Sequence, residues 1–264
     1  MDEEIISEEV GCSNFPSTST DSFKKCTSFR LDPPLANPVD IAVSSEQIIA
    51  IADYDNGVHF MDFMGRIIHH LKSPYKICGV RFWYNNVDDI IKCQVILLGY
   101  IDQKWLIIFH SYPELKEEHI LECPNEPQIL PWARRKITVV DDTLYMLGTC
   151  ESCSTIWTLQ LINLTCLTEA DRLTNTRIVK VKQRKSQKWI VRGPKLAIWD
   201  NEKDLIVYDG SGKLFWFDDT YRIQKIISDL GRSEVCALDI KNGWCYALCR
   251  HRLCVHAFLY RQIR

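Results

Sequence analysis

The sequence predicts an all-β fold, a β-propeller in which four-stranded sheets called blades form a ring. Short runs of Val, Ile, Phe and Tyr alternate with segments rich in Asp, Asn, Gly and Ser, which is the pattern of strands joined by tight turns. No long amphipathic helix pattern interrupts these runs, and this argues against an α/β fold. About four strands recur in every forty-odd residues, which is what a propeller blade needs.

The clearest copy of this unit is the segment from Asp40 to Leu71. Its turn Asn56-Gly57 is a strong hairpin signal, because both residue types tolerate a positive φ. The strands expected in this first blade are Asp40–Val43, Ile48–Ala52, Val58–Phe63 and Ile67–Leu71.

Four looser copies follow the first blade. They cover about Tyr75–Glu122, Pro124–Thr168, Arg177–Ser228 and Glu234 to the last residue. Runs such as Leu205–Tyr208 are apolar at successive positions, as expected of strands covered on both faces. Five blades can be traced, but residues 177–192 fit none of them neatly. That segment is either an extra hairpin or the remnant of a sixth blade.

The N-terminal part divides in two. Residues 1–22 are acidic and then rich in Ser and Thr, so we expect a disordered tail. Residues 23–264 then form a single propeller domain. Phe23–Leu31 is a candidate strand that would complete the last blade and close the ring, which removes an exposed sheet edge.

Composition indicates where in the cell the protein is expected and which general partners it lacks. Apolar residues make up 46% of the chain, and the net charge of −2 gives no general attraction to nucleic acid or membranes. No apolar run reaches the length of a membrane span, and the acidic N-terminus lacks a secretory signal pattern. Twelve cysteines without secretion indicate reduced thiols. We therefore expect an intracellular protein, in the cytoplasm or nucleus, with no membrane contact.

The segment Ile48–Leu71 resembles an NHL repeat, in which an apolar strand ends in Asp-x-x-Asn and a turn glycine precedes the last strand. Asp53, Asn56 and Gly65 occupy these positions. One residue is missing after Asn56, and the arginine usual in the family is absent. The stretch Leu205–Ile227 echoes the pattern through its turn glycines.

WD40 repeats offer a second resemblance. Trp199-Asp200 and Trp216-Phe217-Asp218 are similar to their Trp-Asp dipeptide, although the Gly-His pair is missing. Both resemblances imply a degenerate propeller.

Two groups of Cys and His residues have the composition of metal ligands. Cys150 and Cys153 have the two-residue spacing of a zinc or redox pair, but no second pair follows at a suitable distance. The denser group is Cys245, Cys249, Cys254 and His256, which could meet across a hairpin of the last blade. Because cysteine is commonly buried, structural burial is the favoured interpretation. No metal and no cofactor are expected.

Carboxylates form no evident catalytic pair. Asp53, Asp55, Asp209, Asp218 and Asp219 all fall in predicted turns, where Asp bonds the local backbone. No nucleophile elbow, P-loop or dinucleotide motif is present. We therefore expect a protein that is not an enzyme and has no small-molecule substrate.

Basic residues with aromatics mark two further segments. A cation and aromatic groove suits single-stranded nucleic acid, and cations alone suit an acidic protein. The candidate partner or RNA-binding residues are Arg134, Arg135, Lys136, Arg177, Lys180, Lys182, Arg184, Lys185, Lys188, Trp189 and Arg192.

Loops on a rigid ring commonly carry binding. The sequence therefore favours a non-enzymatic protein–protein interaction module, an adaptor or complex subunit, that uses a propeller rim and the basic hairpin. The first alternative is a propeller that binds single-stranded RNA. The second is a metal-dependent hydrolase with its site in the central channel, as in some propellers that are lactonases, although the sequence shows no evident set of channel ligands.

Overall fold

The computed structural model describes twenty strands and no helix among the residues it places. These residues are 27–31, 35–87, 90–123, 134–140, 142–150, 155–165, 176–179, 196–199, 204–218, 223–228, 235–250 and 254–259. Within them there is accordingly no helix long and apolar enough to cross a membrane.

The strands form five antiparallel sheets of four strands each. The first blade contains β2 (Pro38–Val43), β3 (Ile49–Asp53), β4 (Gly57–Met61) and β5 (Ile67–Leu71). The second contains β6 (Lys76–Val87), β7 (Ile90–Ile101), β8 (Lys104–Tyr112) and β9 (Glu117–Glu122). The third contains β10 (Arg134–Val140), β11 (Thr143–Cys150), β12 (Thr155–Asn163) and β13 (Thr176–Val179). The fourth contains β14 (Leu196–Trp199), β15 (Leu205–Tyr208), β16 (Lys213–Phe217) and β17 (Ile223–Ser228).

The fifth blade closes the ring. It contains β18 (Val235–Lys241), β19 (Trp244–Cys249) and β20 (Cys254–Leu259), and its fourth strand is β1 (Thr27–Arg30). The register pairs Thr27 with Ala257 and Arg30 with Cys254. The expected closing strand is therefore confirmed, and the two ends of the chain share one sheet.

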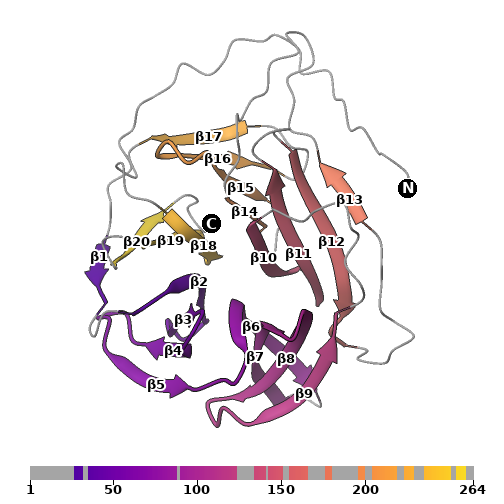
Figure 1. Ribbon diagram of the computed structural model, residues 1–264. Helices are drawn as coiled ribbons and strands as arrows, with labels where there is room; N and C mark the ends of the chain where they lie inside the picture. The colour runs from indigo at the N-terminus through magenta and orange to yellow at the C-terminus, as the bar shows by residue number, and fades with distance from the viewer. Residues whose placement is uncertain are drawn as a thin grey trace.

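Figure 1 shows the five sheets arranged around a common centre, with β2, β6, β10, β14 and β18 on the inside. Each of these first strands contacts the first strand of the next blade, and β18 contacts β2. The predicted β-propeller is confirmed, with five blades.

One sequence expectation about blade boundaries is wrong. The segment beginning at Arg177 was assigned to the fourth blade or to a sixth, but β13 pairs with β12 as the outer strand of the third blade. Ile156 lies opposite Val179, and Leu159 lies opposite Thr176. Of the basic residues in this segment, only Arg177 falls within β13.

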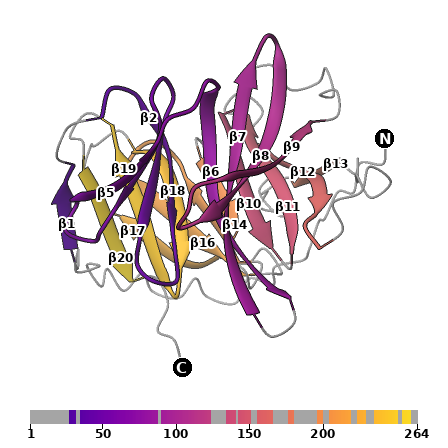
Figure 2. The same ribbon diagram turned by 90° about the horizontal axis from the view of Figure 1, so that it is seen from below.

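The second blade has unusually long strands. The sequence predicted six-residue strands at Gly79–Tyr84 and Gln94–Gly99, whereas β6 and β7 each contain twelve residues. Their pairing continues from Lys76–Tyr100 to Val87–Ile90. Figure 2 shows the strands of this blade extending beyond the neighbouring blades.

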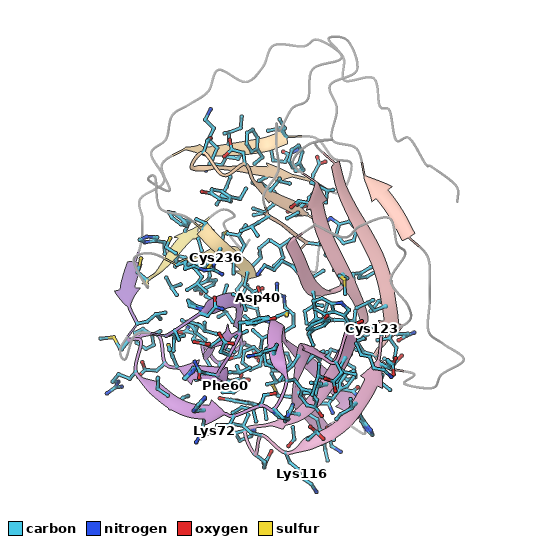
Figure 3. All side chains as sticks on the ribbon, viewed as in Figure 1. Asp40, Phe60, Lys72, Lys116, Cys123 and Cys236 are labelled. Carbon is cyan, nitrogen blue, oxygen red and sulfur yellow. The ribbon has the colours of Figure 1, made fainter. Side chains whose placement is uncertain are left out.

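Apolar side chains fill the spaces between blades. One cluster joins blades one and two and includes Ala50, Phe60, Val80 and Leu97, all essentially inaccessible. Figure 3 places Phe60 within the first blade, whereas Lys72 and Lys116 lie at the outer rim. Both faces of the inner strands are therefore covered, which explains their continuous apolar runs.

The turn after β3 uses both polar residues of the repeat-like motif. Asp53 Oδ1 accepts hydrogen bonds from Asn56 Nδ2 at 3.1 Å and from the Asp55 N–H at 3.2 Å. Gly57 follows with φ of 88°, and a Cβ atom there would lie 2.1 Å from the Leu71 carbonyl oxygen. The turn therefore requires glycine at this position.

Candidate functional site: the channel pocket

Four buried charged side chains lie at the centre of the ring. Asp40, Arg81, Lys136 and Asp239 come from the inner strands of blades one, two, three and five. Figure 3 shows Asp40 in the inner part of the ring. Buried charges are costly unless they are paired and hydrogen-bonded, so their partners decide what this centre can do.

Asp40 accepts hydrogen bonds from two other blades. Its Oδ2 lies 2.9 Å from Arg81 Nη1 and 3.1 Å from the Val80 N–H, and its Oδ1 lies 3.0 Å from Lys136 Nζ. Lys136 Nζ also donates to the Val39 carbonyl. One carboxylate thus links three neighbouring blades.

Asp239 links the last blade to the first. Its Oδ2 accepts the Val43 N–H at 2.6 Å, and its Oδ1 lies 3.9 Å from Arg81 Nε. Burial raises the pKa of Asp239 to about 6, against the opposing effect of the Arg81 charge. Asp239 therefore changes charge close to neutral pH.

A pocket of about 270 Å³ opens beside these charges. Its lining comes from the inner strands of all five blades, at or next to the ends of four of them and from the middle of β6, so it lies at one mouth of the central channel. The lining residues are Val43, Arg81, Phe82, Trp83, Tyr84, Thr138, Val139, Asp142, Trp199, Asp239, Ile240 and Lys241.

Two residues that line this pocket have buried donors without a hydrogen-bond partner among the described residues. Arg81 is 4% exposed and uses Nη1 for Asp40 and the Ile41 carbonyl, while its Nε and Nη2 have no hydrogen-bond partner among the described residues. Trp199 Nε1 is likewise buried without a described partner. Nε and Nη2 form one edge of the guanidinium, the fork that binds carboxylate or phosphate with two hydrogen bonds.

The other aromatic lining residues are fixed by the protein itself. Trp83 Nε1 donates to Asp142 Oδ1 at 2.9 Å. The Tyr84 hydroxyl accepts the Ser45 N–H at 2.7 Å and contacts Glu46, and Lys241 Nζ lies 5.1 Å from the Tyr84 ring centre. These contacts fix Trp83 and Tyr84 in the pocket wall.

The β6–β7 hairpin projects on the same side as the pocket. Arg81 to Tyr84 line the pocket, and β6 continues past them to Val87, where the hairpin turns. Ile90 and Ile91, which follow this turn, are 62% and 71% exposed. Large exposed apolar residues at a projecting tip are typical of a contact surface.

Most candidate binding residues from the sequence lie outside what the structure describes. This holds for Lys180, Lys182, Arg184, Lys185, Lys188, Trp189 and Arg192, and for the side chains of Arg134, Arg135 and Arg177. The backbones of Arg134 and Arg135 lie in β10, and that of Arg177 lies in β13. Lys136 is placed, and it is 7% exposed and bonded to Asp40 at the ring centre instead of lying in a surface cluster.

The channel residues were missed from the sequence, although a signal was present. Asp40, Arg81 and Asp239 are each a single charge within an apolar run, in Val39–Val43, Val80–Tyr84 and Ala237–Ile240 respectively. A lone charge in a strand covered on both faces has to face other buried charges. What a single sequence cannot supply is which strands bring these charges together.

Only three of the four residues in the denser group of candidate metal ligands lie together in the structure. Cys249, Cys254 and His256 converge, with their ligating atoms within 4.8 Å of one another, whereas Cys245 is not part of this group. Within the described part of the chain, this is the only convergence of three or more Cys, His, Asp or Glu ligands. The side chains of Cys150 and Cys153 lie outside the described residues.

The fold and this pocket define the molecule as a five-bladed β-propeller with a pocket at one mouth of its channel. No family model matches the sequence, and no curated protein is similar enough in sequence to count as a relative.

Several solved structures are similar to this chain at low sequence identity. Virginiamycin B lyase from Staphylococcus aureus is 11% identical, with 88% of this chain and 98% of that chain covered and a TM-score of 0.47. BBS1N, crystallised in complex with ARL6DN, is 10% identical over 89% and 80% of the two chains, with a TM-score of 0.48. The WD40 propeller domain of Doa1 is 10% identical over 85% and 79%, with a TM-score of 0.41. None of these likenesses bears on what this chain binds.

Proposed function

We propose that this propeller is a non-enzymatic interaction module that binds an acidic segment of a protein partner at the channel pocket. The observation that carries the proposal is that Arg81 lines the pocket and its buried Nε and Nη2 have no hydrogen-bond partner among the described residues. A carboxylate side chain satisfies both donors at once, and charge-assisted pairs of this kind are the stronger hydrogen bonds.

Pocket size supports a side chain as the bound group. Its volume of about 270 Å³ lies below the range of roughly 300–1,000 Å³ that is typical of sites for drug-sized ligands. A Glu or Asp side chain enters such a pocket while the rest of the partner remains outside. The partner then contacts the apolar tip formed by Ile90 and Ile91.

The charges around the pocket favour an acidic partner. Binding is expected to be strongest in mildly acidic solution. Arg81 and Lys241 are the cations of the lining, and Asp142 and Asp239 are its acids. Asp142 already accepts the Trp83 N–H. Protonation of Asp239 below its pKa of about 6 removes a negative charge that lies 3.9 Å from Arg81 Nε, so binding strengthens as the pH falls toward 6.

A random peptide library displayed on phage tests this function with the purified full chain. Enriched peptides are expected to contain Asp or Glu, and their affinities are then measured for variants. Arg81→Lys keeps a cation beside Asp40 but loses the two-donor edge, so it should weaken binding about 10- to 100-fold. Trp199→Phe removes one N–H and should cost a few-fold.

The hairpin tip has a matched control. Changing Ile90 and Ile91 to Ser should weaken binding at least tenfold, while Ile68→Ser and Ile226→Ser should not. Ile68 and Ile226 are 41% and 40% exposed on the outer strands β5 and β17. Enrichment of uncharged or basic peptides, or equal binding by both variant pairs, would contradict the proposal.

Single-stranded RNA binding through the basic segment is the alternative function, supported by sequence alone. A labelled oligouridine RNA, titrated at about 50 and 200 mM salt, separates the two functions. Under the protein-partner proposal, wild type shows no strongly salt-dependent binding. Strong binding that disappears when Lys180, Lys182, Arg184 and Lys185 are changed to Glu would instead establish the RNA function.

A further inference from the structure

The hairpin of β19 and β20 brings two thiols and an imidazole together inside the last blade. Cys249 and Cys254 are directly opposite in the register, and His256 is two residues after Cys254 on the same face of β20. Their ligating atoms lie within 4.8 Å of one another, and Cys254 Sγ is 3.4 Å from His256 Nε2. Neither cysteine belongs to a disulfide.

We propose that Cys249, Cys254 and His256 bind a zinc ion. Thiolate and imidazole are the ligands that Zn²⁺ prefers, with bonds of about 2.3 Å to sulfur and about 2.0–2.1 Å to nitrogen. Ligand atoms in a tetrahedral site are therefore about 3.3–3.8 Å apart. The observed triangle needs at most about 1 Å of side-chain movement to reach this size.

A zinc site formed by these three side chains would have no net charge, which suits their apolar surroundings. All three are buried, and both cysteines belong to an apolar cluster that also contains Leu196, Ile198 and Phe258. On binding, the two thiols release their protons to solvent, and two thiolates with one neutral histidine exactly offset the charge of Zn²⁺. Tetrahedral coordination needs a fourth donor, and water is the usual one where three protein ligands hold zinc.

The position of the site gives it a structural role. On the other side of β20, the closing strand β1 pairs Arg30 with Cys254 and Ser28 with His256. A metal that joins β19 to β20 therefore holds the strand on which ring closure depends. Metal binding to the folded state only also stabilises that state by mass action.

Metal analysis of the full chain tests the site. Protein purified under reducing conditions with zinc, then dialysed against metal-free buffer, should retain about one zinc per chain. Cys249→Ala and Cys254→Ala should each retain less than about a tenth of this amount. Cys245→Ala and Cys236→Ala are matched controls, since both thiols are buried outside the group, and should retain zinc fully.

A second measurement uses wild-type protein alone, so the proposal can still be tested if the variants fail to fold. Wild-type protein reconstituted with Co²⁺ should show thiolate-to-cobalt charge-transfer absorption, which zinc abolishes by displacement, and chelation should lower the melting temperature. Substoichiometric zinc with no cobalt absorption in folded wild type would overturn the proposal. So would equal zinc retention in all four variants, or a Cys249–Cys254 disulfide in the zinc-supplemented, reduced preparation.

Discussion

Asp40 and Arg81 form a buried ion pair at 2.9 Å between the first and second blades. Lys136 from the third blade lies 3.0 Å from the other oxygen of the same carboxylate. One carboxylate therefore pairs with two cations. Both cations are buried, so water could not take over the role of that carboxylate if it were removed. This arrangement makes Asp40 the side chain on which the centre of the ring most depends.

Asp40→Asn should lower the free energy of unfolding by about 3–5 kcal/mol, because buried Lys136 loses its carboxylate partner and Arg81 keeps only the Asp239 oxygen at 3.9 Å. Glu122→Gln is the matched control, since its ion pair with Lys104 at 3.0 Å is exposed. Exposed pairs contribute at most about 1 kcal/mol. Urea denaturation measures both, and equal costs would contradict the assigned role of Asp40.

Asp239→Asn should alter how stability depends on pH. The folded-state pKa of about 6 lies above the ordinary value of 3.8. The folded protein therefore holds this proton more tightly, and the resulting stability is present below pH 4 and lost as the pH rises through 6. The unfolding free energy of wild type relative to D239N should fall between pH 4 and 6 and stay level above 7. A difference that is constant across this range would show that Asp239 keeps an ordinary pKa.

Gly57→Ala should destabilise the protein by at least about 2 kcal/mol, because a positive φ and an approach to the Leu71 carbonyl act together. Gly210→Ala is the control, since Gly210 also has a positive φ of 79° but lies in an exposed turn. It should cost about 1 kcal/mol. Thermal unfolding of both variants checks the comparison, and similar losses would mean that the close approach relaxes freely.

A chain that begins at Leu31 lacks β1 and leaves the edge of β20 open. It should melt at a lower temperature than wild type and associate through this edge, because an unpaired strand edge accepts another strand. A chain that begins at Phe23 keeps β1 and is the control. Thermal scanning and light scattering measure both properties, and a stable monomer lacking β1 would show that closure is dispensable.

The ring could be predicted from the sequence because the strands of most blades follow one another directly along the chain. The strands of the first and fourth blades match within a few residues, and the closing strand was found because an open edge is unfavourable. Blade three was partly misassigned because β13 is separated from β12 by a long connection. Strand periodicity alone carries no information about pairing across such a distance.

The candidate site could not be predicted in the same way. Arg81, Trp199 and Asp239 come from three different blades, and only the closed ring brings them to one pocket. The sequence-based candidates relied instead on clusters of adjacent basic residues. Lys136 shows the limit of that approach, because its neighbours in sequence indicated a surface position, and its partner Asp40 is nearly a hundred residues away.

Ring closure by β1 has a consequence for how this protein folds. The four-stranded fifth blade requires a pairing between the first and last of the described strands, so it forms only after all intervening blades have been synthesised. Pairings of such large sequence separation are slow, because chain entropy is lost before the contact is gained. Refolding should therefore pass through a ring with one gap, and a molecule caught at that stage presents the edges of β20 and β1 to its neighbours.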